Sequence, residues 1–286
     1  MLRRLLAAVL PDRVKTTAWN LREFLGELVF RPYVIRKNID GVVFNLLIPD
    51  PTAQRWYDND VEWEEMRFIK ERLAKPGDVV FECGGHQGCT ALFLAACVGA
   101  GGKVVTFEPG RKNASVIETN VRLNSVSNIV VEQKAVGAGS GKGLVLGVAS
   151  MCVAPSHRTM SLSQENRHAA PPRGRQEVDL VSLDDYAKEH NLYPTLIKID
   201  VEGYEMEVLK GARHLLERRP KLAIEIHSPT DLARYGASAA ALLKLLDLDR
   251  YECWIQRDHF ATPTVFDGSQ PIDARVHLYA VPRADA

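Results

Sequence analysis

Short apolar runs that alternate with helical patterns make up most of the chain after residue 60. Residues 79–81 (Val-Val-Phe) form a continuous apolar run, which is typical of a strand covered on both faces of a parallel sheet. A helix with an apolar stripe is predicted over residues 91–98. Further strands are predicted at residues 103–108, 128–132, 178–182, 195–200 and 221–227. Strands that alternate with helices predict a doubly wound α/β fold.

The two ends of the chain extend this pattern. Predicted strands at 251–256 and 275–281 can pair antiparallel and close a seven-stranded sheet, unlike the six-stranded parallel sheet of dinucleotide-binding folds. Upstream, we expect a helix to about residue 30 and a β-hairpin turning at Asp40-Gly41. The predicted division is therefore an extension, 1–60, and a domain, 61–286, which begins with a helix over 61–73.

A glycine-rich turn, Gly84-Gly85-His86-Gln87-Gly88, follows the first buried strand. Glycine lacks a Cβ atom, so the backbone can turn sharply and a ligand can lie against it. A dinucleotide fingerprint requires glycine where this chain has Cys83, so that match fails. Glu82 would repel a pyrophosphate at the helix N-terminus but would attract the ammonium and sulfonium groups of S-adenosylmethionine. The turn therefore favours S-adenosylmethionine as the cofactor.

The next two strand ends suggest how a nucleoside would be held. Glu108 ends the second strand about 20 residues after the turn, where nucleotide-binding α/β folds place a carboxylate that holds a ribose diol. Residues 133–137 are predicted as a loop at the carboxyl end of the third strand, so Ala135 is expected to lie against an adenine ring. Residues 54–58 place aromatic side chains beside charges in a predicted loop, which either covers the ligand or packs on the surface.

Ionisable residues also gather at the ends of two later strands. A period of two places Lys198 and Asp200 on one side of their strand, and a carboxylate there is costly unless it meets a ligand or a cation. Asp200 is therefore interpreted as functional. If an alcohol is the nucleophile, a base is needed, and the candidates are His227 first, then Asp200 and Glu202. His227 could equally be a structural hydrogen bonder. With Glu225 these residues could gather a divalent ion, but their spacing is not diagnostic and no metal is predicted.

Residues 138–176 break the alternation and are interpreted as an insertion. Residues 144–153 could form a strand, and the segment after them collects basic side chains among serines and prolines: His157, Arg158, Arg167, His168, Arg173 and Arg175. Long insertions at the ligand edge of an α/β sheet commonly carry specificity, and this charge could meet an anionic sugar or a lipid headgroup. The composition favours the alternative, a solvated and partly disordered loop.

Composition, charge and apolar length argue against several classes of protein. The 36 basic and 36 acidic residues cancel, so the chain has no field suited to nucleic acid. The five cysteines form no C-x-x-C pair and are interpreted as reduced thiols of a cytoplasmic protein. Residues 1–11 lack the cleavage site of a signal peptide, and no apolar stretch approaches the length of a transmembrane helix. A basic N-terminal helix could touch a membrane surface, and the oligomeric state stays open.

Five segments, in this order, resemble the FkbM family of S-adenosylmethionine-dependent methyltransferases: 81–88, 105–109, 134–137, 181–185 and 197–212. The last, IKIDVEGYEMEVLKGA, is the most specific, and the likeness covers about residues 60–230. It implies a class I methyltransferase fold, which is a Rossmann-like, seven-stranded, mostly parallel sheet with helices on both faces. It also implies O-methylation of a hydroxylated small molecule or glycan, often at a sugar hydroxyl in a glycan, glycolipid or natural product.

Matched position by position, the resemblance implies that Glu82 and residues 84–88 hold the methionine end of the cofactor. Glu108 would hold the ribose, and Asp200 would lie beside the methyl donor. Two positions depart from the family pattern, because Glu82 stands where Asp is usual and His86 where Asn is usual. The alternatives are a non-catalytic module that binds the same cofactor and, less readily, an NAD-dependent oxidoreductase.

Overall fold

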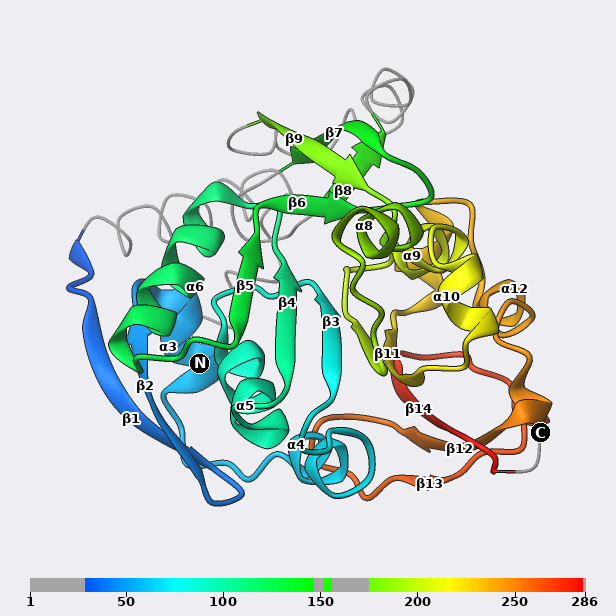
Figure 1. Ribbon diagram of the computed structural model, residues 1–286, viewed down its shortest axis with the longest axis horizontal. Coiled ribbons are helices and arrows are strands. Elements are labelled where there is room, and N and C mark those ends of the chain that lie inside the picture. Colours follow the sequence, from blue (N-terminus) through cyan, green and yellow to red (C-terminus); the bar gives the residue numbers. More distant parts are fainter. Residues whose placement is uncertain (1–28, 147–151, 156–174, 285–286) are drawn as a thin grey trace, which may run out of the picture.

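The computed structural model describes residues 29–146, 152–155 and 175–284 (Figure 1). The helix predicted before residue 30 and most of the basic segment after residue 155 lie outside this part. The predicted hairpin is present as the antiparallel strands β1 (Tyr33–Ile39) and β2 (Val42–Ile48). The predicted loop at 54–58 is wrong, because α3 (Pro51–Tyr57) occupies it: Asp50 caps the first turn and Pro51 suits that position. The expected helix at 61–73 is α4 (Glu64–Phe68), which continues as the π-helix η1 (Ile69–Leu73).

The main sheet follows the strand order β13-β12-β14-β11-β10-β3-β4-β5 among the described residues. Its parallel strands are β3 (Val79–Cys83), β4 (Lys103–Phe107), β5 (Ile129–Glu132), β10 (Leu196–Ile199) and β11 (Lys221–Ile226). The strands β12 (Tyr251–Gln256) and β14 (Val276–Pro282) pair antiparallel and close the sheet, which confirms the seven-stranded arrangement. A short edge strand, β13 (Thr264–Val265), was not predicted.

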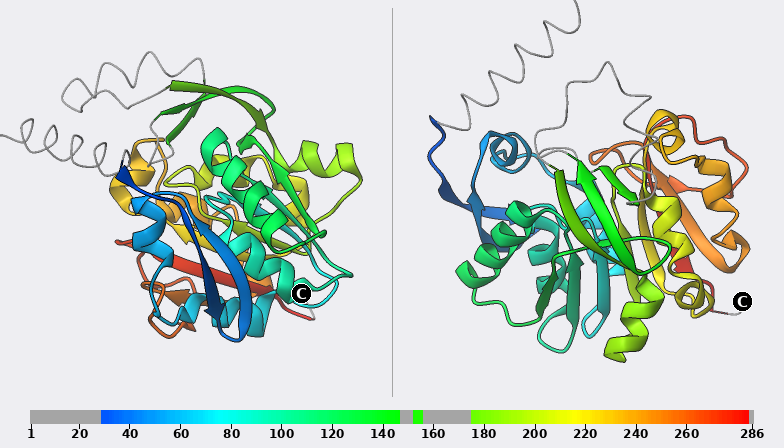
Figure 2. Two further views of the ribbon diagram at one scale, coloured as in Figure 1. Left: turned by 90° about the vertical axis from the view of Figure 1, so that its left-hand side faces the viewer. Right: turned by 90° about the horizontal axis from the view of Figure 1, so that it is seen from above.

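Helices cover both faces of the sheet (Figures 1 and 2). One core lies between the sheet, α4, α5 (Cys89–Val98) and the hairpin, and α6 (Arg111–Leu123) packs against β2. The other core involves α8 (Leu183–His190), α9 (Glu205–Lys210), α10 (Arg213–Glu217), α11 (Pro229–Ala233) and α12 (Ala239–Leu243). The single helix expected from residue 204 to 218 is broken after Lys210, since glycine is a poor helix former. Gly211 packs closely against Gly137, whose carbonyl oxygen would lie 2.0 Å from a Cβ at that position.

A second sheet crosses the carboxyl ends of the parallel strands in Figure 1. It contains β6 (Lys134–Val136), β9 (Arg175–Val181), β7 (Gly141–Leu146) and β8 (Cys152–Pro155), in that order. The loop predicted at 133–137 is therefore a strand, and the insertion supplies strands to a sheet instead of a loop alone. Residues 147–151 and 156–174 lie outside the described part. No helix of the described ranges has both the length and the apolar character needed to cross a membrane.

Candidate active site

The turn after β3 is built by close approach of backbones. Gly84 has a φ of +94°, and a Cβ there would lie 1.8 Å from the carbonyl oxygen of Asp200. A Cβ on Gly85 would lie 2.1 Å from the hydroxyl oxygen of Thr106. These two positions therefore require glycine so that β3, β4 and the segment after β10 can converge. Both glycines also line the cavity described below.

Glu82 lies beneath this turn and is completely buried. Neither of its carboxylate oxygens has a hydrogen-bond partner among the described residues. Burial raises the pKa of Glu82 to about 7, and the nearby Lys198 only partly opposes this. An orphaned carboxylate at the end of a central strand is suited to a cationic ligand group, but Glu82 does not line the cavity, so its contact with the methionine end of S-adenosylmethionine stays a prediction.

Glu108, at the end of β4, holds the turn from the other side. Its carboxylate accepts hydrogen bonds from the backbone N–H groups of His86 and Gly110, both at 2.8 Å. Burial raises the pKa of Glu108 to about 8, although these two bonds oppose the shift. The carboxylate does not line the cavity, so its contact with a ribose stays a prediction.

His86 faces the cavity and has a left-handed backbone, with a φ of +47°. Asparagine and histidine tolerate this region better than most residues, which accounts for a histidine where the family pattern has Asn. Its Nδ1 atom lies 2.6 Å from the hydroxyl oxygen of Tyr57. Burial lowers the pKa of His86, so the ring is neutral and can accept the tyrosine proton.

Besides Glu82 and Glu108, three more of the predicted cofactor residues do not line the cavity. Gln87 is buried and donates a hydrogen bond to Asp50 at 3.1 Å. Gly88 has a φ of +87° and immediately precedes α5. Ala135 is buried in β6 and belongs to a small cluster that includes Val178. The contact between Ala135 and an adenine ring stays a prediction, and it would have to form at a strand instead of the expected loop.

One cavity joins the glycine turn to the ends of β10 and β11. Its wall includes Gly84, Gly85, His86, Lys198, Asp200, Glu202, Glu225 and Arg275, and α3 and the residues after it add Thr52, Trp56, Tyr57, Trp63, Glu65 and Met66. His259, in the loop after β12, completes this side. Residues from the extension and from the last third of the chain therefore meet at the turn.

Lys198 and Asp200 lie on one side of β10 as predicted. The Lys198 ammonium lies 3.5 Å from Asp200 Oδ2, and the Lys198 side chain is buried. Burial alone would raise the pKa of Asp200, but Lys198 together with His227 and His277 outweighs burial, and the pKa falls below its usual value. Asp200 is thus an ionised carboxylate at the cavity wall, and its catalytic role stays a prediction.

His227 does not have the geometry of a general base. Its Nδ1 lies 2.8 Å from Glu205 Oε1, and its Nε2 lies 3.3 Å from Glu202 Oε2. Burial would lower the pKa of His227, but these two carboxylates raise it to about 11. A ring protonated on both nitrogens cannot accept another proton, and His227 does not line the cavity. The structure therefore favours the structural role that the sequence left open, and Asp200 and Glu202 remain as candidate bases.

The sequence analysis had pointed to residues 54–58 as a possible cover of the ligand, and Trp56 and Tyr57 line the cavity, but it missed others of the wall, among them Trp63, Glu65 and His259. Glu65 and His259 lie 194 positions apart, yet His259 Nδ1 lies 2.6 Å from Glu65 Oε2. No spacing in the sequence links them. The start of α3 had a usable signal, since Asp50 followed by Pro51 is typical of a helix N-terminus.

Three comparisons bear on the identity of the chain. The model of the methyltransferase FkbM domain matches residues 82–252. The hexuronic acid methyltransferase AglP of Haloferax volcanii is 24% identical over 206 residues, which cover 70% of this chain and 79% of that protein.

Solved structures match more loosely. Fibrillarin of Aeropyrum pernix with bound S-adenosyl-L-methionine is 16% identical, with a TM-score of 0.42 and coverage of 88% of this chain and 84% of that one. A SAM-dependent O-methyltransferase of Thermotoga maritima is 14% identical, with a TM-score of 0.42 and coverage of 89% and 79%. Because these scores are low, the fold assignment depends on the strand order and the family match. The family model covers more than half of the chain, and the chain therefore belongs to the FkbM family of methyltransferases, whose methyl donor is S-adenosylmethionine.

Proposed function

We propose that this methyltransferase transfers the methyl group to a hydroxyl oxygen of a sugar, in a glycan, a glycolipid or a natural product. The observation that carries the proposal is the single cavity in which Gly84 and Gly85 face Asp200 and Glu202. A cofactor held at the glycine turn and an acceptor held at the far wall would then share one space.

The acceptor side of the cavity suits a polar ring. Trp56 lines it with 46% of its surface exposed, and Trp63 lies close by. Indole rings offer flat apolar faces with a polar edge, which suits the mixed surface of a sugar. The similarity to a hexuronic acid methyltransferase supports a sugar acceptor. Arg275, 41% exposed at its side chain, is a cation that could face an acidic sugar.

Chemically, S-adenosylmethionine supplies an electrophilic methyl group bound to a sulfonium. Transfer requires the acceptor oxygen to approach in line with the carbon–sulfur bond. In our proposal, Asp200 or Glu202 accepts the hydroxyl proton as the new oxygen–carbon bond forms and the carbon–sulfur bond breaks. Lys198 keeps Asp200 ionised and fixes its orientation from below.

Two measurements test this function. Calorimetric titration with S-adenosylhomocysteine, and separately with NAD, should show micromolar binding of the former alone. Transfer of a labelled methyl group should then be screened against neutral sugars, uronic acids and glycolipids, with the label located by mass spectrometry. A label on nitrogen or carbon would contradict the O-methyl assignment. Binding without transfer to any hydroxylated acceptor would favour the non-catalytic module.

A further inference from the structure

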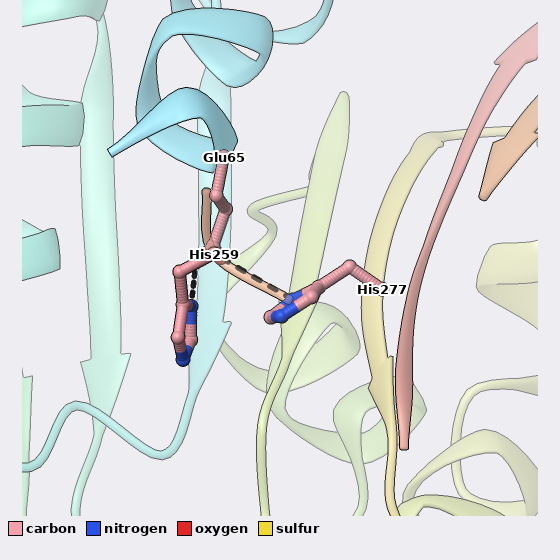
Figure 3. Close-up of side chains that lie close together, drawn as sticks. All are labelled: Glu65, His259 and His277. Carbon is pink, nitrogen blue, oxygen red and sulfur yellow. Dashed lines mark hydrogen bonds and ion pairs between the residues drawn. The ribbon is translucent and has the colours of Figure 1, made fainter. Parts of the chain in front are cut away.

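Glu65, His259 and His277 come together at the edge of the cavity (Figure 3). Glu65 lies in the first turn of α4, His259 in the loop after β12, and His277 in β14. One possible metal-ligand atom from each residue lies within 4.8 Å of the other two. None of the three has a role in the methyl transfer proposed above.

The distances within this cluster differ between its two sides. Glu65 Oε2 and His259 Nδ1 are 2.6 Å apart, which is a direct hydrogen bond. Glu65 Oε1 and His277 Nδ1 are 3.7 Å apart, which is too long for one. Two ligands that each lie about 2.1 Å from a tetrahedral zinc ion are separated by roughly 3.4 Å. The gap beside His277 therefore has about the width that a bound ion spans.

Apart from the contact with Glu65, the ring nitrogens of His277 have no partner in the described part of the chain. The residue is 2% exposed, and its Nε2 has no hydrogen-bond partner. Nδ1, the other ring nitrogen, faces Glu65 and is the atom placed to bind an ion.

The charges around the cluster favour an added cation. Glu65, Glu82, Asp200 and Glu225 all act on the buried ammonium of Lys198. The other cation at this wall, Arg275, lies 3.2 Å from Glu225. Four carboxyl side chains line the cavity, Glu65, Asp200, Glu202 and Glu225, beside one lysine and one arginine, Lys198 and Arg275.

We propose that Glu65, His259 and His277 form a binding site for a first-row divalent metal ion such as Zn²⁺. Two imidazole nitrogens and one carboxylate are a common donor set for zinc, whereas Mg²⁺ and Ca²⁺ prefer oxygen ligands. Glu65 and His259 line the cavity, so a remaining coordination position faces it and can accept water or an oxygen of a ligand. This metal site is proposed whatever acceptor the enzyme methylates.

Cobalt titration tests this site directly. The full chain, without an affinity tag, is stripped with a chelator, dialysed and titrated with Co²⁺ while the visible absorption is recorded. We expect one Co²⁺ per chain, displaced by Zn²⁺. Glu65→Gln, His259→Gln and His277→Gln should each weaken Co²⁺ binding at least about tenfold, because even residues that only support metal ligands cost 10–100-fold when mutated. Circular dichroism identifies which variants fold.

The chain provides matched controls. His214 is an exposed histidine 3.1 Å from Asp184, so His214→Gln removes a histidine–carboxylate pair on the surface and should leave Co²⁺ affinity unchanged. Asp200, Glu202 and His227 form another group of possible ligands, and Glu202→Gln tests it. The proposal is overturned if the folded parent binds no Co²⁺, if the folded variants bind it as tightly as the parent, or if affinity follows Glu202. These titrations need neither cofactor nor acceptor, so their outcome is separate from that of the proposed function.

Discussion

The hydroxyl oxygen of Tyr57 lies 2.6 Å from Nδ1 of His86, which joins the last residue of α3 to the turn after β3. At the other end of the helix, Asp50 caps the first turn and also accepts hydrogen bonds from Gln87 and Lys112. Both ends of α3 are thus hydrogen-bonded to the glycine turn, and Asp50 also binds Lys112 of α6. The extension therefore contacts the glycine turn, lines the cavity and helps to fix the conformation of that turn.

Tyr57→Phe should loosen this connection while keeping the ring in place. A net hydrogen bond contributes about 0.5–1.5 kcal/mol, so the free energy of unfolding should fall by about 1 kcal/mol. Affinity for S-adenosylhomocysteine should fall several-fold, because His86 loses the contact that orients it. Urea unfolding and calorimetry measure both. Tyr33→Phe, at an exposed bond to Asp58, is the control and should change neither quantity appreciably. Equal effects of the two variants would contradict the prediction.

The strands were predictable because each is a short apolar run, and their alternation with helices indicated a mostly parallel sheet. Glu82, Glu108 and Asp200 were found for the same reason, since each ends such a run and parallel strands place their carboxyl ends at one edge. The cluster of Glu65, His259 and His277 had no such signal. Its members meet only when the antiparallel strand β14 closes the sheet against α4, which is a tertiary event that local patterns do not encode.

His227 shows a second limit of prediction from sequence, since the sequence suggested a role that its packing does not support. Its position at a strand end suggested a base, but the sequence could not reveal that Glu205, at the start of the earlier helix α9, would contact its Nδ1 atom. Reactivity depends on the partners of both ring nitrogens, and those partners come from three-dimensional packing.

Asp200→Asn should abolish turnover while the protein stays folded and binds S-adenosylhomocysteine. The amide cannot accept the hydroxyl proton, and it removes the carboxylate that pairs with the buried Lys198, so some loss of stability is expected too. Initial rates of methyl transfer and thermal unfolding separate the two effects. Asp179→Asn is the control, because Asp179 pairs with Lys142 at the exposed surface. Turnover at the parent rate in the Asp200 variant would remove that residue from the mechanism.

Gly84→Ala should be strongly destabilising. The new Cβ would lie 1.8 Å from the carbonyl oxygen of Asp200, and the φ of +94° is unfavourable for alanine. Backbone strain alone costs about 1–3 kcal/mol, and the overlap adds to it. Gly101→Ala is the matched control, since nothing lies within 4 Å of a Cβ there. Urea denaturation should show a much lower midpoint for the Gly84 variant, and similar midpoints would show that the turn can relax.

His227→Gln should change the pH dependence of stability. The pKa of His227 is about 11 in the folded chain, above the ordinary value of 6.5. The stabilisation from its two carboxylate partners is therefore full below pH 6.5 and is lost as the pH rises towards 11. Between pH 7 and 10 the parent should lose stability relative to the variant by on the order of 1 kcal/mol per pH unit. If the stabilities of the two proteins changed with pH in the same way, His227 would not be held protonated by its two carboxylate partners. Nitrogen NMR of the parent at pH 8 should show both ring nitrogens protonated.

Glu82 gives the pH dependence of cofactor binding. Burial raises its pKa to about 7 from an ordinary 4.5. Between these two values the folded chain keeps a proton that the unfolded chain has released, so this carboxyl makes the protein less stable as the pH rises from 4.5 to 7. A cationic ligand reverses the preference, because it favours the ionised carboxylate. Binding of S-adenosylmethionine should then release a proton from Glu82.

Affinity for S-adenosylmethionine should consequently rise between pH 6 and 8, by up to about tenfold per pH unit below the pKa of Glu82. Glu82→Gln should reduce that slope and release fewer protons, as measured by calorimetry at pH 6 in two buffers of different ionisation enthalpy. Part of the slope should persist in the variant, because burial also raises the pKa of Glu108. Glu177→Gln, at an exposed position, should behave as the parent does. An unchanged proton release in the Glu82 variant would show that Glu82 does not lose a proton when the cofactor binds. Glu108 would then be the source of that proton.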